Sequence, residues 1–400
     1  MADRYIIHYA ELGLKGRNRI NFERRLVSNI ITALSDLGDF KVRRFHSYIV
    51  VTAPGEAPTS EIEHRLTRLP GIAYFAPTTV TPLDIAAITD AALDLAKHTI
   101  RPDMSFRVRT TRGNKQFPIR STDVDHQVGG DVQDLTHARV DLSNADVTLS
   151  IQIYEDGAYL FARRIRGLGG LPLGSSGHVM ALFSGGIDSP VAAHLIMKRG
   201  CAVDFVHFHL LRGPEQIRSS KIVAMARQVL APHRTPGRLY MVSAAPFEVA
   251  MAPLDSRVAT VVFRRFTLRA ADRLARHRRA QALITGESVG QVASQTLKNI
   301  NLIAQATHLP ILRPLIAMDK VEIINLARKI ETYQLSIQPY KDPCSLHSRK
   351  PATWAQLEDV LAVEEAIGVN ALVEETLANH VEEIRIVFED AQGALHLRSR

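Results

Sequence analysis

The spacing of hydrophobic positions in the first sixty residues predicts a strand, a helix and a second strand. The apolar runs YIIHYA and SYIVVT predict the strands. The segment from Asn18 through FERRLVSNIITALSDLG has the period of an amphipathic helix that ends near Gly38. Pro, Gly and Ser residues between positions 54 and 60 predict a joint after the second strand. We therefore expect an N-terminal α+β domain over residues 1–58.

The next hundred residues mix helical and extended patterns and predict a second small α+β domain over residues 59–165. The segments EIEHRLTRL and ITDAALDLAKHTI have helical periods, whereas SFRVRTT and DVTLSIQIYEDGAYLFARRI have the patterns of strands. The segment RVRTTRGNKQFPIRST holds four arginines and a lysine, so much of its charge must face solvent. It is either a solvated strand and loop or a surface that contacts phosphates.

A glycine-rich stretch, GLGGLPLGSSG, predicts a linker over residues 166–177, and the pattern changes after it. The nearly continuous apolar runs HVMALF, CAVDFVHFHL, RLYMVSA and QALITG alternate with amphipathic segments near 189–199, 215–231 and 255–279. Apolar strands separated by amphipathic helices indicate a parallel sheet that is covered on both faces. The expected fold class of residues 178–400 is therefore α/β.

Composition narrows the class of protein. The 400 residues are 46% hydrophobic and include 49 Lys and Arg against 41 Asp and Glu, a formal net charge of +8 that favours a polyanionic partner without requiring one. Two cysteines, Cys201 and Cys344, are too few for a disulfide framework or a Cys-based zinc or iron–sulfur site. No stretch approaches the ~18 apolar residues of a membrane span. We expect a cytoplasmic protein that does not insert into membranes.

The segment HVMALFSGGIDSPVAAHLIMKRG carries the clearest chemical pattern: an apolar strand, a Ser-Gly-Gly turn, and a helix that starts at Asp188 or Ser189. Successive glycines let backbone N–H groups approach a phosphate, and a helix N-terminus adds unpaired donors with partial positive charge. The segment matches neither the Walker A pattern nor the dinucleotide-binding pattern. A simple glycine-containing turn is the alternative.

The SGGIDS turn resembles the pyrophosphate-binding loop of ATP pyrophosphatases, which cleave ATP between its α and β phosphates to adenylate a substrate. The segments IHYAELGLKGRNRINFE, FPIRST, LITGESVGQVASQTLKNI and RPLIAMDKVEIINLARKI resemble the tRNA 4-thiouridine synthetases, or tRNA sulfurtransferases, over residues 5 to about 345. The resemblance implies a ferredoxin-like first domain, a THUMP RNA-binding second domain and a Rossmann-like ATP-pyrophosphatase (PP-loop) third domain. One position departs from the family pattern: the family usually has Gly before the Glu at position 11, whereas this chain has Ala10.

Carried over residue by residue, the resemblance implies a set of ATP contacts: Leu182, Phe183, Ser184, Gly185, Gly186, Asp188, Ser189, His207, Phe208, Arg264, Gly286 and Gln295. Several of these positions follow neighbouring strands, at the sheet edge where such folds bind ligands. Alternation of His207 and His209 along one strand would also suit metal ligands, but no third ligand is spaced to join them. Arg265 is expected to share the face of Arg264, with the later arginines facing tRNA or water.

The catalytic residues implied by the resemblance are Asp188, Lys320 and Cys344. Asp188 either holds Mg²⁺ against the triphosphate or caps the helix that follows it. Lys320 matches a family lysine needed for activity, and a surface lysine is the alternative. Cys344 occupies the position of the family's sulfur-handling cysteine, in a loop where Lys341 and His347 favour a thiolate. Cys201 opens an apolar strand and is expected to be a small buried hydrophobe.

The implied reaction uses ATP and Mg²⁺ to adenylate O4 of the uridine at tRNA position 8, after which persulfide sulfur displaces AMP. About fifty residues follow Cys344; their pattern is mostly helical, and they are too few for the rhodanese domain of some relatives. The sulfur is therefore expected from a cysteine desulfurase or another persulfide donor. A homodimer and a role in making the thiamine thiazole are family expectations. The alternatives are a non-catalytic tRNA-binding protein with a relic nucleotide site and another PP-loop adenylating enzyme.

Overall fold

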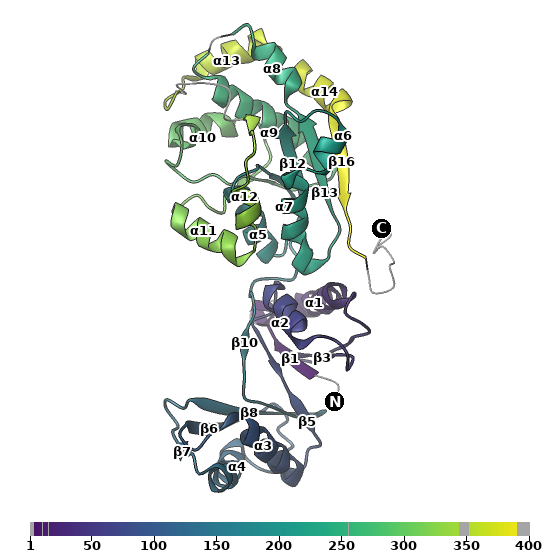
Figure 1. Ribbon diagram of the computed structural model, residues 1–400, viewed down its shortest axis with the longest axis vertical. Coiled ribbons are helices and arrows are strands. Elements are labelled where there is room, and N and C mark those ends of the chain that lie inside the picture. The colour runs from purple at the N-terminus through teal and green to yellow at the C-terminus, as the bar shows by residue number, and fades with distance from the viewer. Residues whose placement is uncertain (1–3, 10, 15, 255, 344–351, 390–400) are drawn as a thin grey trace. The chain divides into compact units, whose positions relative to one another are not determined.

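The computed structural model describes residues 4–9, 11–14, 16–254, 256–343 and 352–389. The chain divides into two compact units, Met1–Gly169 and Gly170–Arg400 (Figure 1). The division falls within the glycine-rich stretch expected to be a linker. No helix in the described part of the chain is long and apolar enough to cross a membrane.

The first unit begins with an antiparallel sheet in the order β10-β4-β1-β3-β2. Its strands are β1 (Arg4–His8), β2 (Lys41–Arg44), β3 (Ile49–Thr52), β4 (Tyr74–Pro77) and β10 (Ile165–Arg166), and its helices are α1 (Arg19–Leu34) and α2 (Thr59–Arg68). The chain order of β1, α1, β2, β3, α2 and β4 is that of a ferredoxin-like fold, as expected. A boundary at residue 58 is therefore too early, because α2 and β4 complete this sheet and β4 pairs with β1.

A second sheet in the same unit has the order β5-β9-β8-β6-β7. Its strands are β5 (Thr79–Thr81), β6 (Ser105–Arg112), β7 (Arg139–Val140), β8 (Val147–Tyr154) and β9 (Gly157–Phe161), and helices α3 (Ile85–Thr99) and α4 (Ser121–Thr136) pack on it. Phe106 and Val108 of β6 join the core formed with these helices. Because side chains alternate along a strand, Arg107 and Arg109 lie on the opposite face.

The second unit is built on a six-stranded sheet in the order β15-β14-β11-β12-β13-β16, as Figure 1 shows in part. Its strands are β11 (His178–Leu182), β12 (Ala202–His209), β13 (Gly237–Ser243), β14 (Leu283–Ile284), β15 (Ile311–Leu312) and β16 (Val381–Ile386). The first five in this order are parallel, which confirms the expected α/β class. The segment after Cys344 was expected to be mostly helical, but β16 pairs antiparallel with the edge strand β13.

Helices cover both faces of this sheet and bury a separate core on each. One core joins α5 (Asp188–Lys198), α7 (Lys221–Leu230) and α11 (Lys320–Lys329). The other joins α8 (Ala245–Met251), α9 (Ala259–His277), α10 (Leu297–Ala304), α13 (Leu357–Ala366) and α14 (Val369–Asn379). The helix expected near 215–231 is two helices, α6 (Pro214–Arg218) and α7. A short helix, α12 (Tyr333–Ser336), precedes Cys344 in sequence.

Strand order creates the place where the site forms. The chain leaves β11 for β12 on one side and later returns to β14 on the other side of β11. Loops that leave two neighbouring strands in opposite directions open a crevice at their carboxyl ends, which is where open α/β sheets bind ligands.

Candidate functional site

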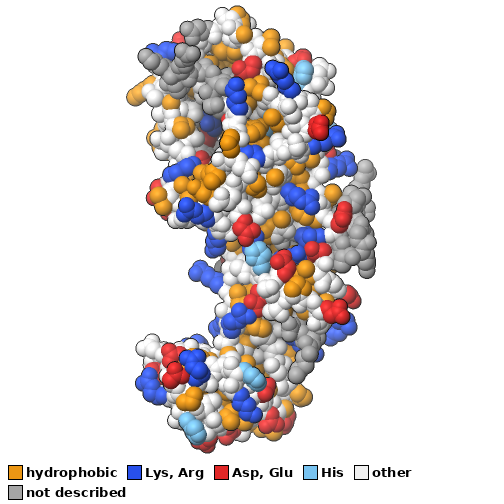
Figure 2. Space-filling model, in the orientation of Figure 1, with side chains coloured by type: hydrophobic (Ala, Val, Ile, Leu, Met, Phe, Trp, Pro, Cys, Tyr) orange, Lys and Arg blue, Asp and Glu red, His pale blue; other side chains and the backbone are white. Residues whose placement is uncertain are grey.

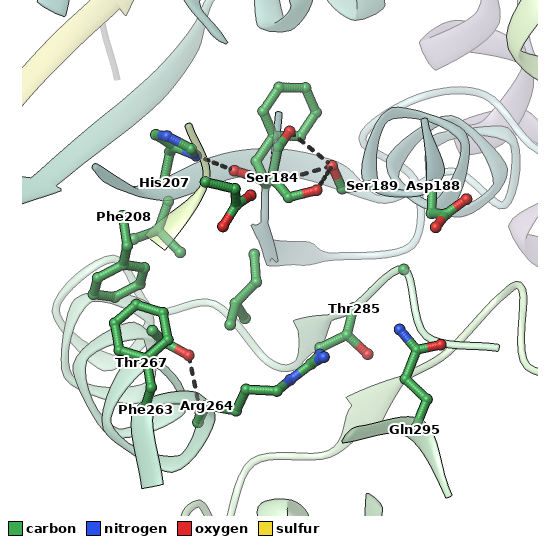
Figure 3. Close-up of a pocket in the computed structure, with 15 residues that line it drawn as sticks. Ser184, Asp188, Ser189, His207, Phe208, Phe263, Arg264, Thr267, Thr285 and Gln295 are labelled. Atoms are coloured by element: carbon green, nitrogen blue, oxygen red, sulfur yellow. Dashed lines mark hydrogen bonds between the residues drawn. The ribbon is translucent and has the colours of Figure 1, made fainter. Parts of the chain in front are cut away.

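A cavity of about 230 Å³ lies at this crevice (Figure 3). Ten of the residues expected to contact ATP line it: Leu182, Phe183, Ser184, Asp188, Ser189, His207, Phe208, Arg264, Gly286 and Gln295. Gly185 and Gly186 form the turn between these residues but are not among the lining side chains. The fold thus brings together residues that are spread over more than a hundred positions of sequence.

The Ser-Gly-Gly turn is held in shape by its own serines, as the dashed lines in Figure 3 show. The buried Ser189 hydroxyl accepts a hydrogen bond from the Ser184 N–H at 2.9 Å and donates to the Ser184 carbonyl at 3.1 Å. Ser184 Oγ in turn accepts from the Gly186 N–H at 3.3 Å. The N-cap of α5, Ile187, makes no side-chain cap hydrogen bond to the first turn of this helix.

Two glycines are required by close packing around the turn. A Cβ at Gly286 would lie 3.0 Å from the backbone C of Asp188 and the backbone N of Ser189, where nothing can shift cheaply. A Cβ at Gly185 would lie 2.7 Å from the Tyr340 ring. The loop after β14 and the segment near Tyr340 therefore press directly on the phosphate-binding turn.

The Asp188 carboxylate is bonded by side chains from two later segments. Lys320 Nζ lies 2.5 Å from Oδ1, and Gln291 Nε2 donates to Oδ2 at 2.9 Å. Asp188 is the first residue of α5, after the N-cap Ile187, and its carboxylate is bonded by Lys320 and Gln291, which does not support the capping alternative. Lys320 begins α11 behind the cap Asp319, which forms a capping box with Glu322. Lys320 is exposed, as in the alternative of a surface lysine, but it is paired with Asp188.

Both ring nitrogens of the buried His207 are engaged. Nδ1 donates to the Phe183 carbonyl and Nε2 accepts from the Tyr340 hydroxyl, each at 2.6 Å. A carbonyl only accepts, so this arrangement fixes the neutral tautomer. Burial lowers the pKa of His207 to about 4, although the charge of Asp342 opposes the shift. The nearby His209 instead accepts from the Leu211 N–H.

Arg264 reaches the cavity because a buried carboxylate holds it. Its Nη2 donates to Glu287 Oε1 at 2.8 Å, and the other Glu287 oxygen accepts from Arg313 at 2.6 Å and from the Thr285 hydroxyl at 3.0 Å. Four residues of the site were not predicted from the sequence: Glu287, Arg313, Gln291 and Tyr340. Their only sequence signal was that the first three lie inside segments that resemble the family.

The structure corrects the expected face of Arg265, whereas Arg273 and Arg276 are exposed, as expected for the later arginines. Arg265 is buried away from the cavity and pairs with Glu364 of α13 at 2.7 Å. Arg269 joins the same carboxylate, and Arg273, Arg276 and Arg278 pair with Glu374, Asp272 and Asp204. Arg265, Arg269 and Arg273 tie α9 to α13 and α14, and Arg276 pairs within α9, so their charge is largely compensated within the unit.

Of the two cysteines, Cys201 lies within the described residues. Cys344 lies outside the described residues, while Asp342, two positions before it in sequence, lines the cavity. Cys201 is half-buried, donates weakly to the Ser176 carbonyl, and has its pKa raised by burial. A raised thiol pKa disfavours the reactive thiolate.

In the first unit, the exposed face of the second sheet carries a basic hollow of about 300 Å³, lined by Arg107, Arg109, Asp146, Thr148, Ser150, Ala162 and Arg164. Arg164 also stacks on the Tyr74 ring. On the face drawn in Figure 2, Lys and Arg side chains are mixed with Asp and Glu over both units, with no single extended basic patch. The basic hollow is therefore a local feature of the arginine-rich segment.

Models of known protein families match segments of both units. Residues 174–369 match the family described as "Thiamine biosynthesis protein (ThiI)", residues 4–76 match the ThiI ferredoxin-like domain, and residues 83–163 match the THUMP domain. The chain is 40% identical to a probable tRNA sulfurtransferase of Caldanaerobacter subterraneus subsp. tengcongensis, over 94% of this chain and 98% of the relative. The chain belongs to the tRNA sulfurtransferase family.

Other tRNA sulfurtransferase relatives and one solved structure agree with this assignment. A probable tRNA sulfurtransferase of Brevibacillus brevis is 39% identical over 96% of both chains. A 4-thiouridine synthetase whose crystal structure contains RNA and bound ATP is 28% identical, with a TM-score of 0.86 over 96% of this chain and 100% of that chain. The expected family and its domain types are therefore confirmed.

Proposed function

We propose that this chain is an ATP-dependent tRNA sulfurtransferase that forms 4-thiouridine at tRNA position 8. The observation that supports this most directly is the phosphate-binding turn of residues 184–189, bordered by the Asp188–Lys320 pair, in a chain that also has the family's RNA-binding domain type. A relic nucleotide site would have no need to retain this pair beside an open cavity.

The chemistry requires a better leaving group than oxide at C4 of uracil. O4 attacks the α-phosphorus, the bond from that phosphorus to the bridging oxygen breaks, and pyrophosphate leaves. The terminal sulfur of a persulfide then attacks C4, and the C4–O4 bond breaks as AMP leaves. A second thiol breaks the remaining S–S bond and forms a disulfide with its partner.

The residues of the cavity suit the first half of this sequence. The turn and the N-terminus of α5 present N–H groups to the departing pyrophosphate. Lys320 adds a cation beside the transferring phosphoryl group. Mg²⁺ in nucleotide sites takes one or two carboxylates plus phosphate oxygens and water, so Asp188 would hold the ion and the ion would offset phosphate charge. Leu182, Phe183 and Phe208 supply strand-end backbone and an apolar wall for the nucleoside.

The second half of the reaction is assigned to Cys344, which either carries the persulfide or resolves it. Sulfur arrives from a cysteine desulfurase or another persulfide donor. We place the reaction in the cytoplasm, where thiols stay reduced and tRNA is available. A homodimer, and a contribution to thiamine thiazole synthesis, extend the proposal on the strength of the family.

The decisive experiment measures 4-thiouridine in unmodified tRNA by near-ultraviolet absorbance and nucleoside mass spectrometry, with ATP, Mg²⁺, cysteine and a cysteine desulfurase. Wild type should thiolate, Asp188→Ala should abolish both thiolation and AMP release, and Cys344→Ser should stop thiolation. Asp359→Ala, at an exposed position of α13, and Cys201→Ser are the matched controls and should retain activity. Tight tRNA binding without thiolation by wild type would instead favour a non-catalytic binding protein.

A further inference from the structure

A second hollow, of about 440 Å³, adjoins the phosphate-binding turn. It is lined by two segments, Ser288–Gln291 and Ile316–Lys320, and we call it the 288–320 groove. Gln291 and Lys320 of the groove bond the two oxygens of Asp188, which itself lines the nucleotide cavity. The Asp188 carboxylate therefore links the groove to the cavity. The helices that follow the two segments in sequence, α10 and α11, are both drawn at the left of the second unit in Figure 1.

Hydrogen bonds join the two segments that line the groove. The Val289 N–H donates to the Ile316 carbonyl at 3.1 Å, and the Ser288 hydroxyl donates to the Met318 carbonyl at 2.9 Å. The capping box of α11 fixes the residue before Lys320. A site with these restraints is preformed, and its volume lies within the roughly 300–1,000 Å³ of small-ligand sites.

The surface of the groove is apolar with a polar end. Val289 on its wall is 44% exposed, and Ile316, Ala317 and Met318 also line it. The amide of Gln291 and the ammonium of Lys320 supply the polar end, next to Asp188. A nucleobase has the same division, because its flat faces are apolar and its edge carries donors and acceptors.

Asp188 fixes which way the Gln291 amide faces. A carboxylate only accepts hydrogen bonds, so Nε2 must be the end that meets Asp188, as observed. The oxygen Oε1 is then held as an acceptor, and no described residue donates to it. One hydrogen of Nε2 also remains. Reversing the amide to suit another ligand would place Oε1 against the carboxylate, which is unfavourable.

A fixed acceptor beside a donor is complementary to the N3–H and O4 edge of uracil and is not complementary to the corresponding edge of cytosine. Uracil presents the N3–H donor next to the O4 acceptor, whereas cytosine presents an unprotonated N3 next to an amino group. Gln291 Oε1 can accept from N3–H while Nε2 donates to O4. Because this end of the groove adjoins Asp188, a base bound in this way presents O4 towards the triphosphate site.

We infer that the 288–320 groove receives the target uracil and that Gln291 selects it by its N3–H and O4 edge. This inference rests on the proposed function and assigns the substrate site of the same reaction. Gln291 is a substrate-contacting specificity residue, and its bond to Asp188 ties recognition of the base to the carboxylate beside the phosphates.

The reaction product supplies a direct probe, because 4-thiouridine forms zero-length crosslinks when irradiated at wavelengths that the protein does not absorb. Full-length protein would be mixed with tRNA carrying 4-thiouridine at position 8, irradiated, digested and sequenced by mass spectrometry. Crosslinks on residues 288–291 or 316–320 are the expected result. Crosslinks confined to other residues, or none despite saturating tRNA, would overturn the inference.

A methyl group on N3 tests the role of Gln291 itself. The same tRNA with 3-methyl-4-thiouridine lacks the N3–H donor, so its crosslinking to the groove should fall several-fold in wild type. In Gln291→Ala the methyl group should make no difference, because its hydrogen-bond partner is gone. An equal effect of the methyl group in both proteins would show that Gln291 does not contact N3.

Steady-state kinetics separate this role from a structural one. Gln291→Ala should lower the rate of 4-thiouridine formation by about 10- to 100-fold, while the Kd values for tRNA and ATP stay within about threefold. Gln305→Ala, an exposed glutamine after α10, is the control. If wild type forms no 4-thiouridine, the proposed function fails. If wild type is active and Gln291→Ala matches it, only the present inference fails.

Discussion

At the scale of single residues, His207 shows how a site residue is fixed by its surroundings. The ring bridges the Phe183 carbonyl and the Tyr340 hydroxyl and is 2% exposed. Burial disfavours the imidazolium, and the bond to a carbonyl sets the tautomer. His207 is therefore neutral and bridges the end of β11 and the segment around Tyr340. Because both ring nitrogens are engaged in this way, a metal-ligand role is disfavoured.

The lowered pKa of His207 predicts acid sensitivity of the second unit. In the unfolded chain this histidine titrates near pH 6.5, and in the folded chain near pH 4. The unfolded state therefore binds the extra proton first, so stability is full above pH 6.5 and falls as the pH drops towards 4, by up to roughly 1.4 kcal/mol per pH unit. His207→Gln should remove this part of the slope in urea unfolding followed by the fluorescence of Trp354, the one tryptophan of the chain.

The exposed His277→Gln, at the end of α9, is the control for this measurement and should keep the wild-type slope. If His207→Gln shows the same pH dependence as wild type, the histidine does not remain neutral in the folded protein.

At the scale of elements, the segment after α12 is docked on the phosphate-binding turn. Lys221, the first residue of α7, donates to the carbonyls of Ser336 and Gln338 at 2.9 and 2.7 Å. Its ammonium also lies 5.5 Å from the centre of the Tyr340 ring, which presses on Gly185. Burial lowers the pKa of Lys221. This docking holds the stretch of chain that leads, in sequence, to Cys344.

Lys221→Met should therefore separate the two halves of the reaction. The methionine keeps the apolar contact but removes the donor to both carbonyls, so the segment loses its anchor while the turn keeps its serines. We expect 4-thiouridine formation to fall about tenfold more than tRNA-dependent AMP release, since each lost hydrogen bond from a charged group is worth about 1.5–3 kcal/mol. Quantifying AMP and 4-thiouridine in the same reaction tests this ratio.

The control for this prediction is Lys329→Met, which removes an exposed lysine at the end of α11. An unchanged ratio of AMP to 4-thiouridine in Lys221→Met, with both rates lowered together, would mean that the segment serves adenylation and sulfur transfer equally.

At the scale of the whole molecule, the two units divide the requirements of the proposed reaction. The second unit holds the nucleotide cavity and the 288–320 groove. The first unit holds the basic hollow on the face of its second sheet that is not covered by α3 and α4. Shape and phosphate contacts dominate the recognition of folded RNA, so a hollow lined by three arginines is suited to the RNA backbone.

Arg109→Ala is expected to weaken tRNA binding without altering the nucleotide site. Loss of one phosphate contact should lower the slope of log K against log salt by about one and leave ATP affinity unchanged. Filter binding of tRNA at several salt concentrations measures this. Arg101→Ala, which removes an exposed arginine paired with Asp103, is the control. A slope equal to that of wild type would exclude a phosphate contact at Arg109.

Local pattern determined much of the fold. Apolar runs and helical periods identified four of the five parallel strands, all but β15, and the helices α5, α7 and α9, because such patterns follow from burial of one face or both. The edge strand β16 and the short β2 were missed, since VEEIRI and KVRR carry charges that resemble solvated helix or loop. The predicted domain boundary at residue 58 was wrong, because Pro and Gly residues are typical both of a loop inside a domain and of a linker between domains.

The sequence by itself determined the strand, turn and helix start around residues 184–189, because they are contiguous and their physics is local. It also determined the family, through segments that resemble it between residues 5 and about 345. Only the tertiary structure decided the partners of those residues. Asp188 and Lys320 are 132 positions apart, and Arg265 and Glu364 are 99 apart. Pairing at such separations depends on strand order and helix packing, and the spacing of residues along a chain does not encode it directly.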